Sequence, residues 1–240
     1  MNNFLALDTS TEFLSLALHK GDKRFTVDLL AGQSHSQIIL PQLQQLLTSA
    51  GLQLSDLHGI AFGAGPGSFT GVRIAAGIAQ GLAYGAKLPV IGVCTLQALA
   101  EASGADNVIA CLDARMGEVY HAVYVRKAHI SKNSVVENDT WQAVIAPGLY
   151  KPESVPSVEG DSWVGVGSGW QTYGEQLSGK YAGQLLETQP SLMPTASAML
   201  NIALPIFAAG NGLPASEAMP IYIRNRVALK TAEREQGLRL

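Results

Sequence analysis

Two aspartates that follow similar apolar segments are the residues best suited to chemistry. Asp8 ends the apolar residues 4–8, and Asp113 ends the similar residues 109–113, which lie 105 positions further along the chain. Each aspartate is expected in a turn directly after a strand. Carboxylate oxygens in such turns can face a phosphate or bind Mg²⁺. The pair therefore marks two candidate positions for chemistry, one in each half of the chain.

A glycine-rich turn is expected between a strand at residues 58–62 and a helix at residues 69–84. Its three alternating glycines are Gly63, Gly65 and Gly67. Ser68 can cap the helix, and a strand, a glycine-rich turn and a helix N-terminus together are typical of anion binding. The turn lacks the lysine of a P-loop and the last glycine of the dinucleotide fingerprint, so it matches neither motif.

The turn that follows the second aspartate is less suited to phosphate. Ala114 stands where a glycine would let the backbone approach a phosphate closely, and Arg115 would fill or bind that space. The two turns are therefore not equivalent. Purely structural roles remain open, with Asp8 forming a turn and Arg115 pairing with a local acid. The candidate nucleotide-site residues are Asp8, Thr9, Ser10, Gly65, Gly67, Ser68, Asp113 and Arg115.

The expected helix at residues 69–84 has little side-chain bulk on one side. Glycine costs about 1 kcal/mol relative to alanine inside a helix, so the close approach of another helix must offset this cost. That helix could belong to the same domain or to a partner subunit. The expected helix at residues 34–50 adds apolar side chains. The candidate partner-facing residues are His35, Ile38, Leu43, Leu46, Phe69, Gly71, Arg73, Ile74, Gly77 and Gly81.

The order of expected elements restarts halfway along the chain. Strands are expected at residues 3–7, 13–19, 24–30, 58–62 and 90–94, and helices at residues 34–50, 69–84 and 95–102. This βββαβαβα order begins again at residue 109, and residues 166–169 echo residues 62–65. In the second copy, the polar and turn-rich residues 126–162 are expected to replace the long first helix with loops. The sequence therefore predicts an α/β protein with domains at residues 1–104 and 105–224, followed by a polar, basic tail at 225–240.

Composition argues for a folded protein with an apolar surface. The chain has 240 residues, of which 47% are hydrophobic and 15% charged, so it can form one large or two small domains and expose an interface. A net charge of −3 argues against a dominant basic surface for nucleic acid. Residues 1–7 lack the basic start of a signal peptide, and no apolar run reaches membrane-spanning length. A cytoplasmic protein without a membrane segment is expected.

Five separated segments resemble the TsaB family, also called YeaZ, which takes part in making threonylcarbamoyladenosine in tRNA. In chain order the segments are residues 7–10, 35–37, 63–73, 91–93 and 112–120. The tandem units, each with an aspartate in the turn after its first strand, resemble the actin-like ATPase superfamily. The resemblance implies two RNase H-like domains, the second of them degenerate.

The resemblance also implies a non-catalytic scaffold subunit. In this family TsaB pairs with TsaD, which transfers the threonylcarbamoyl group to adenosine 37 of tRNA, and works with the ATPase TsaE. The helices that correspond to residues 34–50 and 69–84 are those that meet TsaD. The chain alone would then bind no cofactor tightly, with ATP or ADP held weakly or at the interface of the complex. It would reach tRNA only indirectly, and it could also form a homodimer.

No metal site is expected. TsaD carries a His-x-x-x-His metal pair after the strand that matches residues 90–93, and this chain has Thr95 and Leu99 there. Neither side chain binds a transition metal as imidazole does, which disfavours a metalloprotease. The remaining alternative is an actin-fold ATPase or small-molecule kinase that uses Asp8 and Asp113. Such an enzyme would turn over ATP without a partner, whereas a scaffold would not.

Overall fold

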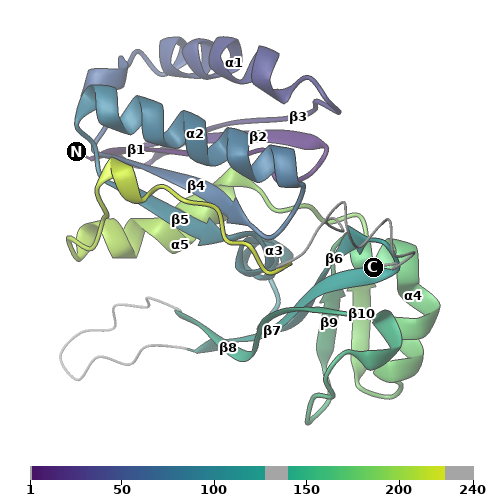
Figure 1. Ribbon diagram of the computed structural model, residues 1–240. Helices are drawn as coiled ribbons and strands as arrows, with labels where there is room; N and C mark the ends of the chain where they lie inside the picture. The colour runs from purple at the N-terminus through teal and green to yellow at the C-terminus, as the bar shows by residue number, and fades with distance from the viewer. Residues whose placement is uncertain (1, 128–139, 225–240) are drawn as a thin grey trace, which may run out of the picture.

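Two five-stranded mixed sheets form the frame of the protein (Figure 1). The structure is a computed structural model that describes residues 2–127 and 140–224. The first sheet has the order β3-β2-β1-β4-β5. Its strands are β1 (Asn3–Asp8), β2 (Phe13–Lys20), β3 (Lys23–Leu30), β4 (Gly59–Gly65) and β5 (Val90–Cys94). The predicted strands of this half are confirmed, although β4 continues into the glycine-rich turn.

The second sheet repeats the topology of the first. Its order is β10-β9-β6-β7-β8, with strands β6 (Asn107–Arg115), β7 (Glu118–Lys127), β8 (Thr140–Tyr150), β9 (Trp163–Val166) and β10 (Leu185–Gln189). In each sheet three antiparallel strands follow one another, and two parallel strands extend the other side of the first strand. The sheet of the second half is therefore complete.

The prediction of loops over residues 126–162, of which 128–139 lie outside the described residues, is only partly right. The long helix of the first half is α1 (His35–Ser49), and its counterpart is the single turn η2 (Pro152–Ser154), as expected. The same stretch also contains β8, which the sequence did not predict. This strand lies at the edge of its sheet, where proline is tolerated, so it can contain Pro147.

Helices cover both faces of the first sheet. Leu5 and Leu7 of β1 face α1 and α2 (Phe69–Ala86), whereas Phe4 and Ala6 face α5 (Ala196–Ala208), because successive side chains of a strand point to opposite sides. The short helix η1 (Leu54–Asp56) precedes β4. Although α5 follows the second sheet in the chain, it packs on β1, β2 and β4 of the first. The assignment of all residues 105–224 to a second domain is therefore wrong for α5.

Helix α3 (Thr95–Ser103) lies at the junction between the two sheets (Figure 1). Its Ala98 packs in the core under α5, while Leu96 and Leu99 pack against β6 and β9 in the core of the second half. On the opposite face of the second sheet, α4 (Ser168–Lys180) contributes Trp170 and Leu177. The two halves thus share an apolar helix rather than meeting through a flexible linker.

The last described residues run back along α2. Leu213 pairs with Val90 of β5, and the short helix η3 (Ala215–Glu217) packs on α2. In Figure 1 this yellow segment then crosses from α2 toward the second sheet. Within the described ranges, no helix has the length and apolar character needed to cross a membrane. The predicted tail at residues 225–240 lies outside the described residues.

Candidate functional site

Asp8 lies buried at the end of β1, where the site was predicted. Its Oδ2 atom accepts hydrogen bonds from Ser10 Oγ at 2.8 Å and from Ser10 N at 3.2 Å. Its Oδ1 atom is buried without a hydrogen-bond partner. Burial raises the pKa of Asp8 to about 7, although the hydrogen bonds from Ser10 and the Thr9 backbone act in the opposite direction. The carboxyl group faces the interior of the chain instead of an open cleft.

The glycines of the turn provide space for this part of the chain itself. A Cβ atom at Gly63 would lie 1.8 Å from Asp8 Oδ1, and one at Gly67 would lie 2.5 Å from Ser10 O. Ser68 N donates to the same Ser10 carbonyl at 2.7 Å. The two turns therefore pack directly on each other, and the space that a phosphate would need beside Gly63 and Gly67 is filled.

The start of α2 is held by the same packing. Ser68 caps the helix as predicted, because its Oγ accepts from Gly71 N at 3.3 Å. Thr9 Oγ1 donates to Gly71 O at 2.7 Å, and a Cβ atom at Gly71 would lie 1.9 Å from Thr9 O. Gly71 is thus required for a contact within the chain. Its prediction as a partner-facing residue is wrong.

The C-terminal segment covers the remaining glycine of the turn. Ile221 N donates to Ala64 O at 2.7 Å, and Ile221 O lies 3.1 Å from the position of a Cβ atom on Gly65. Gly65 has a φ of 104°, which favours glycine at this position regardless of the covering segment. The described residues thus leave no open phosphate cradle at this turn.

The second turn is satisfied locally. Arg115 N donates to Asp113 Oδ1 at 2.8 Å, and Arg115 Nη1 lies 3.1 Å from Asp113 Oδ2. This is the structural alternative for Arg115, a pairing with a nearby acid. Among the described residues, no hydrogen bond or ion pair joins this turn directly to residues 8–10. With Asp8 buried and Asp113 paired, the residues present do not fit a clamped Mg-nucleotide.

The two positions compared with a metal-binding pair serve the fold. Thr95 Oγ1 donates to the Pro66 carbonyl behind the glycine-rich turn, and Leu99 is buried in the core of the second half. Over the part of the chain that the structure describes, no three His, Cys, Asp or Glu side chains gather in a way that could hold a metal ion.

Much of the predicted partner surface on α1 belongs to the core. Leu43 and Leu46 pack in the first hydrophobic cluster, and His35 is buried with its Nε2 atom 3.1 Å from Phe13 O. These three residues cannot line a partner surface, so their assignment is wrong. Ile38 is half-buried against the same cluster.

The outer face of α2 is open to solvent. Phe69, Arg73, Gly77 and Gly81 are exposed, and Ile74 is half-buried. No atom lies within 4 Å of a Cβ atom built on Gly77 or Gly81. Gly77 and Gly81 can meet a partner, because nothing in the described chain covers them.

The sequence interpretation missed Tyr222, which lies beside the N-terminal end of this face. Its ring centroid is 6.1 Å from that of Phe69, and its hydroxyl accepts from Arg73 Nε at 2.7 Å. The contact joins residues 149 positions apart, which no local sequence pattern reveals.

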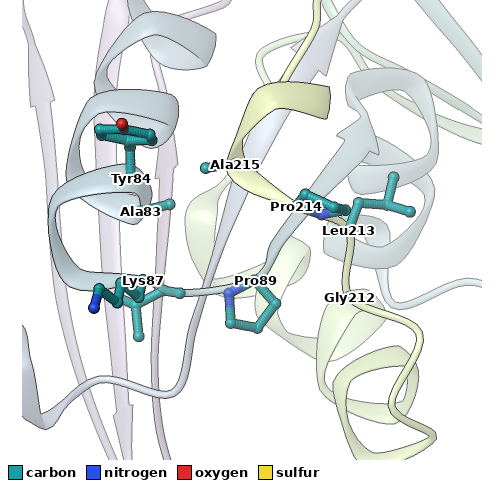
Figure 2. A pocket seen from close by; sticks show the side chains of 9 residues that line it. Ala83, Tyr84, Lys87, Pro89, Gly212, Leu213, Pro214 and Ala215 are labelled. Carbon is teal, nitrogen blue, oxygen red and sulfur yellow. The ribbon is translucent and has the colours of Figure 1, made fainter.

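An open pocket lies at the opposite end of α2 from the glycine-rich turn. Figure 2 shows Tyr84 and Lys87 on one side and Leu213 and Pro214 on the other. The lining residues are Ala83, Tyr84, Lys87, Leu88, Pro89, Gly212, Leu213, Pro214 and Ala215. Lys87 is the only charged residue in this set, so the pocket lacks the converging polar groups of a catalytic site.

Comparisons with known proteins agree with this architecture. The model of the family described as "TsaD: tRNA N6-adenosine threonylcarbamoyltransferase" matches residues 27–202. A solved structure, YeaZ from Pseudomonas aeruginosa, has a TM-score of 0.81 and 36% identity, and the match covers 92% of this chain and 100% of that one. The predicted fold class is confirmed: the protein is an α/β protein of the actin-like, RNase H-like type.

Curated relatives define the family more narrowly. The tRNA threonylcarbamoyladenosine biosynthesis protein TsaB of Escherichia coli (strain K12) is 44% identical, over 94% of this chain and 96% of its own length. The protein of the same name from Haemophilus influenzae is 40% identical, over 94% and 95%. This chain belongs to the TsaB family.

Proposed function

We propose that the protein acts in tRNA threonylcarbamoyladenosine biosynthesis as a non-catalytic subunit that pairs with TsaD. TsaE would join through the complex, and tRNA would be contacted indirectly. Family membership supports the pathway, because close relatives carry this activity in their names. The proposal implies action in the cytoplasm, with no tightly bound cofactor or metal on the lone chain and ATP or ADP bound only weakly or at the complex interface.

The outer face of α2 carries the proposal. Gly77 and Gly81 lie one helical turn apart with open space above them, and Ile74 and Phe69 flank them with partly exposed apolar surface. A helix from another subunit could approach this backbone closely and bury the apolar side chains, at roughly 25 cal/mol per Å². The same face could also pair two copies of this chain.

The closed first turn argues against the alternative of an ATPase or kinase. An enzyme of that type needs accessible ionised carboxylates for Mg²⁺. Asp8 is instead buried with a pKa raised to about 7 by its burial, and Asp113 is paired with Arg115. These residues would bind Mg-ATP poorly.

The junction between the two halves argues in the same direction, because nucleotide enzymes of hinged folds close their domains around the substrate. Glu101 of α3 accepts hydrogen bonds from Asn201 of α5 and Trp141 of β8, each at 2.8 Å, and pairs with Arg126 at 3.3 Å. Arg24 Nη1 donates to Asn201 Oδ1 at 2.7 Å. Together with the shared helix α3, this network should hold the halves in one orientation, which suits a scaffold better than a hinged enzyme.

The test combines binding and activity. Gly77→Leu adds bulk to the open face and Ile74→Glu adds a charge. Each should weaken TsaD binding measured by calorimetry by about fivefold or more, as expected for a cost of about 1–3 kcal/mol. Both variants should lower tRNA modification in an assay with TsaD and TsaE. The matched control is Gly179→Leu, an exposed glycine in α4 that also has open space above it.

The proposal fails if both variants fold normally and bind TsaD as tightly as the parent. Rapid ATP turnover by the lone chain, with low-micromolar affinity for Mg-ATP, would favour the kinase alternative instead.

A further inference from the structure

Arg73 is the single charged side chain on the two helices that cover the outer side of the first sheet. Helix α2 contains no Asp, Glu or Lys, and α1 contains no Asp, Glu, Lys or Arg. Arg73 lies on the same face of α2 as Gly77 and Gly81, one and two helical turns away, and it is exposed. A single cation on an otherwise uncharged docking face calls for an explanation.

The Arg73 guanidinium is held in place by two aromatic side chains. Its Cζ atom lies 3.7 Å from the centroid of the Phe69 ring and 5.5 Å from that of Tyr222. Its Nε atom donates to the Tyr222 hydroxyl at 2.7 Å. Among the described residues no carboxylate forms an ion pair with it. The stacked group therefore keeps its two terminal amino groups available.

The segment that carries Tyr222 is itself anchored on both sides. Ile221 N donates to Ala64 O at 2.7 Å, which fixes the segment to the first half of the protein. Arg224 Nη2 lies 2.7 Å from Glu118 Oε2 and donates to Ala114 O at 3.1 Å, which fixes it to the second half. The position of the Tyr222 hydroxyl, and with it that of the guanidinium, is thus set before any partner arrives.

We propose that Arg73 receives a carboxylate from a helix of the partner that docks on α2, and that this pairing selects the partner. The inference rests on the proposed function and assigns the chemistry of the partner at that surface. A planar guanidinium binds a carboxylate through two parallel hydrogen bonds, which adds orientation to attraction. Because Phe69 and Tyr222 already restrict the side chain, little further ordering is needed on binding. Arginine and tyrosine in such positions commonly dominate interface energies.

The same residue disfavours a second copy of the chain as the occupant. Two copies that pair through α2 would bring two Arg73 side chains to one interface, and neither α1 nor α2 offers a carboxylate to either of them. Covering an unpaired charge is unfavourable, and such a repulsive element discriminates between partners. The structure therefore favours an acidic partner helix over self-pairing.

The experiment measures TsaD binding by calorimetry for Arg73→Gln, Arg73→Glu and Arg73→Lys in the full chain. Arg73→Gln should weaken binding by about 30-fold or more, as for a central charged interface residue. Arg73→Glu should weaken binding further. Arg73→Lys keeps the charge but cannot form the two parallel hydrogen bonds, so its affinity should lie between those of the parent and Arg73→Gln. Lys87→Gln removes a cation from the other end of α2 and should change the affinity by less than about threefold if only the local pairing matters.

A charge-reversal scan identifies the acceptor. Each Asp and Glu on the partner's exposed helices is changed to Arg and tested against Arg73→Glu, and one reversal should restore binding that the others do not. Sedimentation of the lone chain should show stronger self-association for Arg73→Gln than for the parent. Binding of Arg73→Glu as tight as that of the parent, or a scan with no restoring position, would overturn the inference. If Ile74→Glu still abolishes binding in that case, the proposed function stands without it; if Ile74→Glu also binds normally, both fall.

Discussion

The glycines near the start of α2 and those further along the helix look alike in the sequence, but their surroundings are opposite. Gly63, Gly67 and Gly71 lie against Asp8, Ser10 and Thr9, where a Cβ atom would meet another atom at 2.5 Å or less. Gly77 and Gly81, further along the helix, have nothing within 4 Å of the same position. The first set is explained by contacts within the chain. The second set costs helix stability and gains nothing in the isolated protein, which is why it points to a partner.

The difference also shows why an anion-binding pattern can be misleading. A strand, a glycine-rich turn and a capped helix predict a phosphate cradle, because backbone N–H groups would be accessible there. Here Ser68 N is already bonded to Ser10 O, and Asp8 occupies the space beside Gly63. The glycines that would admit a phosphate instead admit the neighbouring turn.

The largest expected effect concerns the Asp8 carboxyl, which packs against Gly63 in the glycine-rich turn. Burial raises its pKa from 3.8 to about 7, so the folded chain holds this proton more tightly than the unfolded chain does. The resulting stability is fully present below pH 3.8 and is lost as the pH rises through 7, with a total of about 4 kcal/mol. Asp8→Asn removes this contribution. The free energy of unfolding of the variant, relative to that of the parent, should therefore rise by about 4 kcal/mol from pH 4 to pH 8.

Urea unfolding of Asp8→Asn and the parent across this pH range checks the prediction. His121 is present in both proteins; burial lowers its pKa from 6.5 to about 4, so its stabilising effect is present above pH 6.5 and is lost as the pH falls to 4. Its contribution cancels in the difference between the two curves. A difference that does not change with pH would mean that Asp8 is ionised and solvated in the folded protein.

A second prediction tests the contact that fills the start of α2. Gly71→Ala places a methyl group 1.9 Å from the Thr9 carbonyl oxygen, a backbone atom that cannot rotate away. The free energy of unfolding should fall by about 2–3 kcal/mol, as for overpacking of a tight site. Urea denaturation of the lone chain measures this loss. Unchanged stability would show that the two turns can separate. Gly71 would then not differ from the glycines that have open space above them.

The sequence predicted the strands of the first sheet because each is a short apolar run bounded by turn residues. It also predicted the restart of the pattern, because β6 repeats the apolar run and aspartate of β1. It could not predict β8, because Pro147 and Gly148 within this strand suit an edge strand and a loop equally well. The sequence also could not predict that α5 packs on the first sheet, because the sequence of an apolar helix does not indicate which sheet it covers.

The candidate site shows the same division. Leu43 and Leu46 were assigned to a partner because the apolar face of a helix looks the same in sequence whether it meets its own sheet or another protein. The pairing of Arg115 with Asp113 was one of two alternatives, and only local backbone geometry could decide between them. The contact of Arg73 with Phe69 and with the Tyr222 hydroxyl joins residues 149 positions apart, which no local pattern reveals.

The smallest expected effect concerns the open glycines. It distinguishes the effect of helix propensity on stability from the effect of bulk on partner binding. Gly77→Ala adds a methyl group that meets nothing in the lone chain, so the better helix propensity of alanine should raise the free energy of unfolding by about 1 kcal/mol. The same methyl group should weaken TsaD binding if the partner helix lies against this backbone. Urea denaturation and calorimetry on one protein sample measure both quantities. If the lone variant is less stable than the parent, a contact from this chain must cover Gly77. If it is more stable and binds TsaD with unchanged affinity, close approach of a partner helix does not explain the glycine.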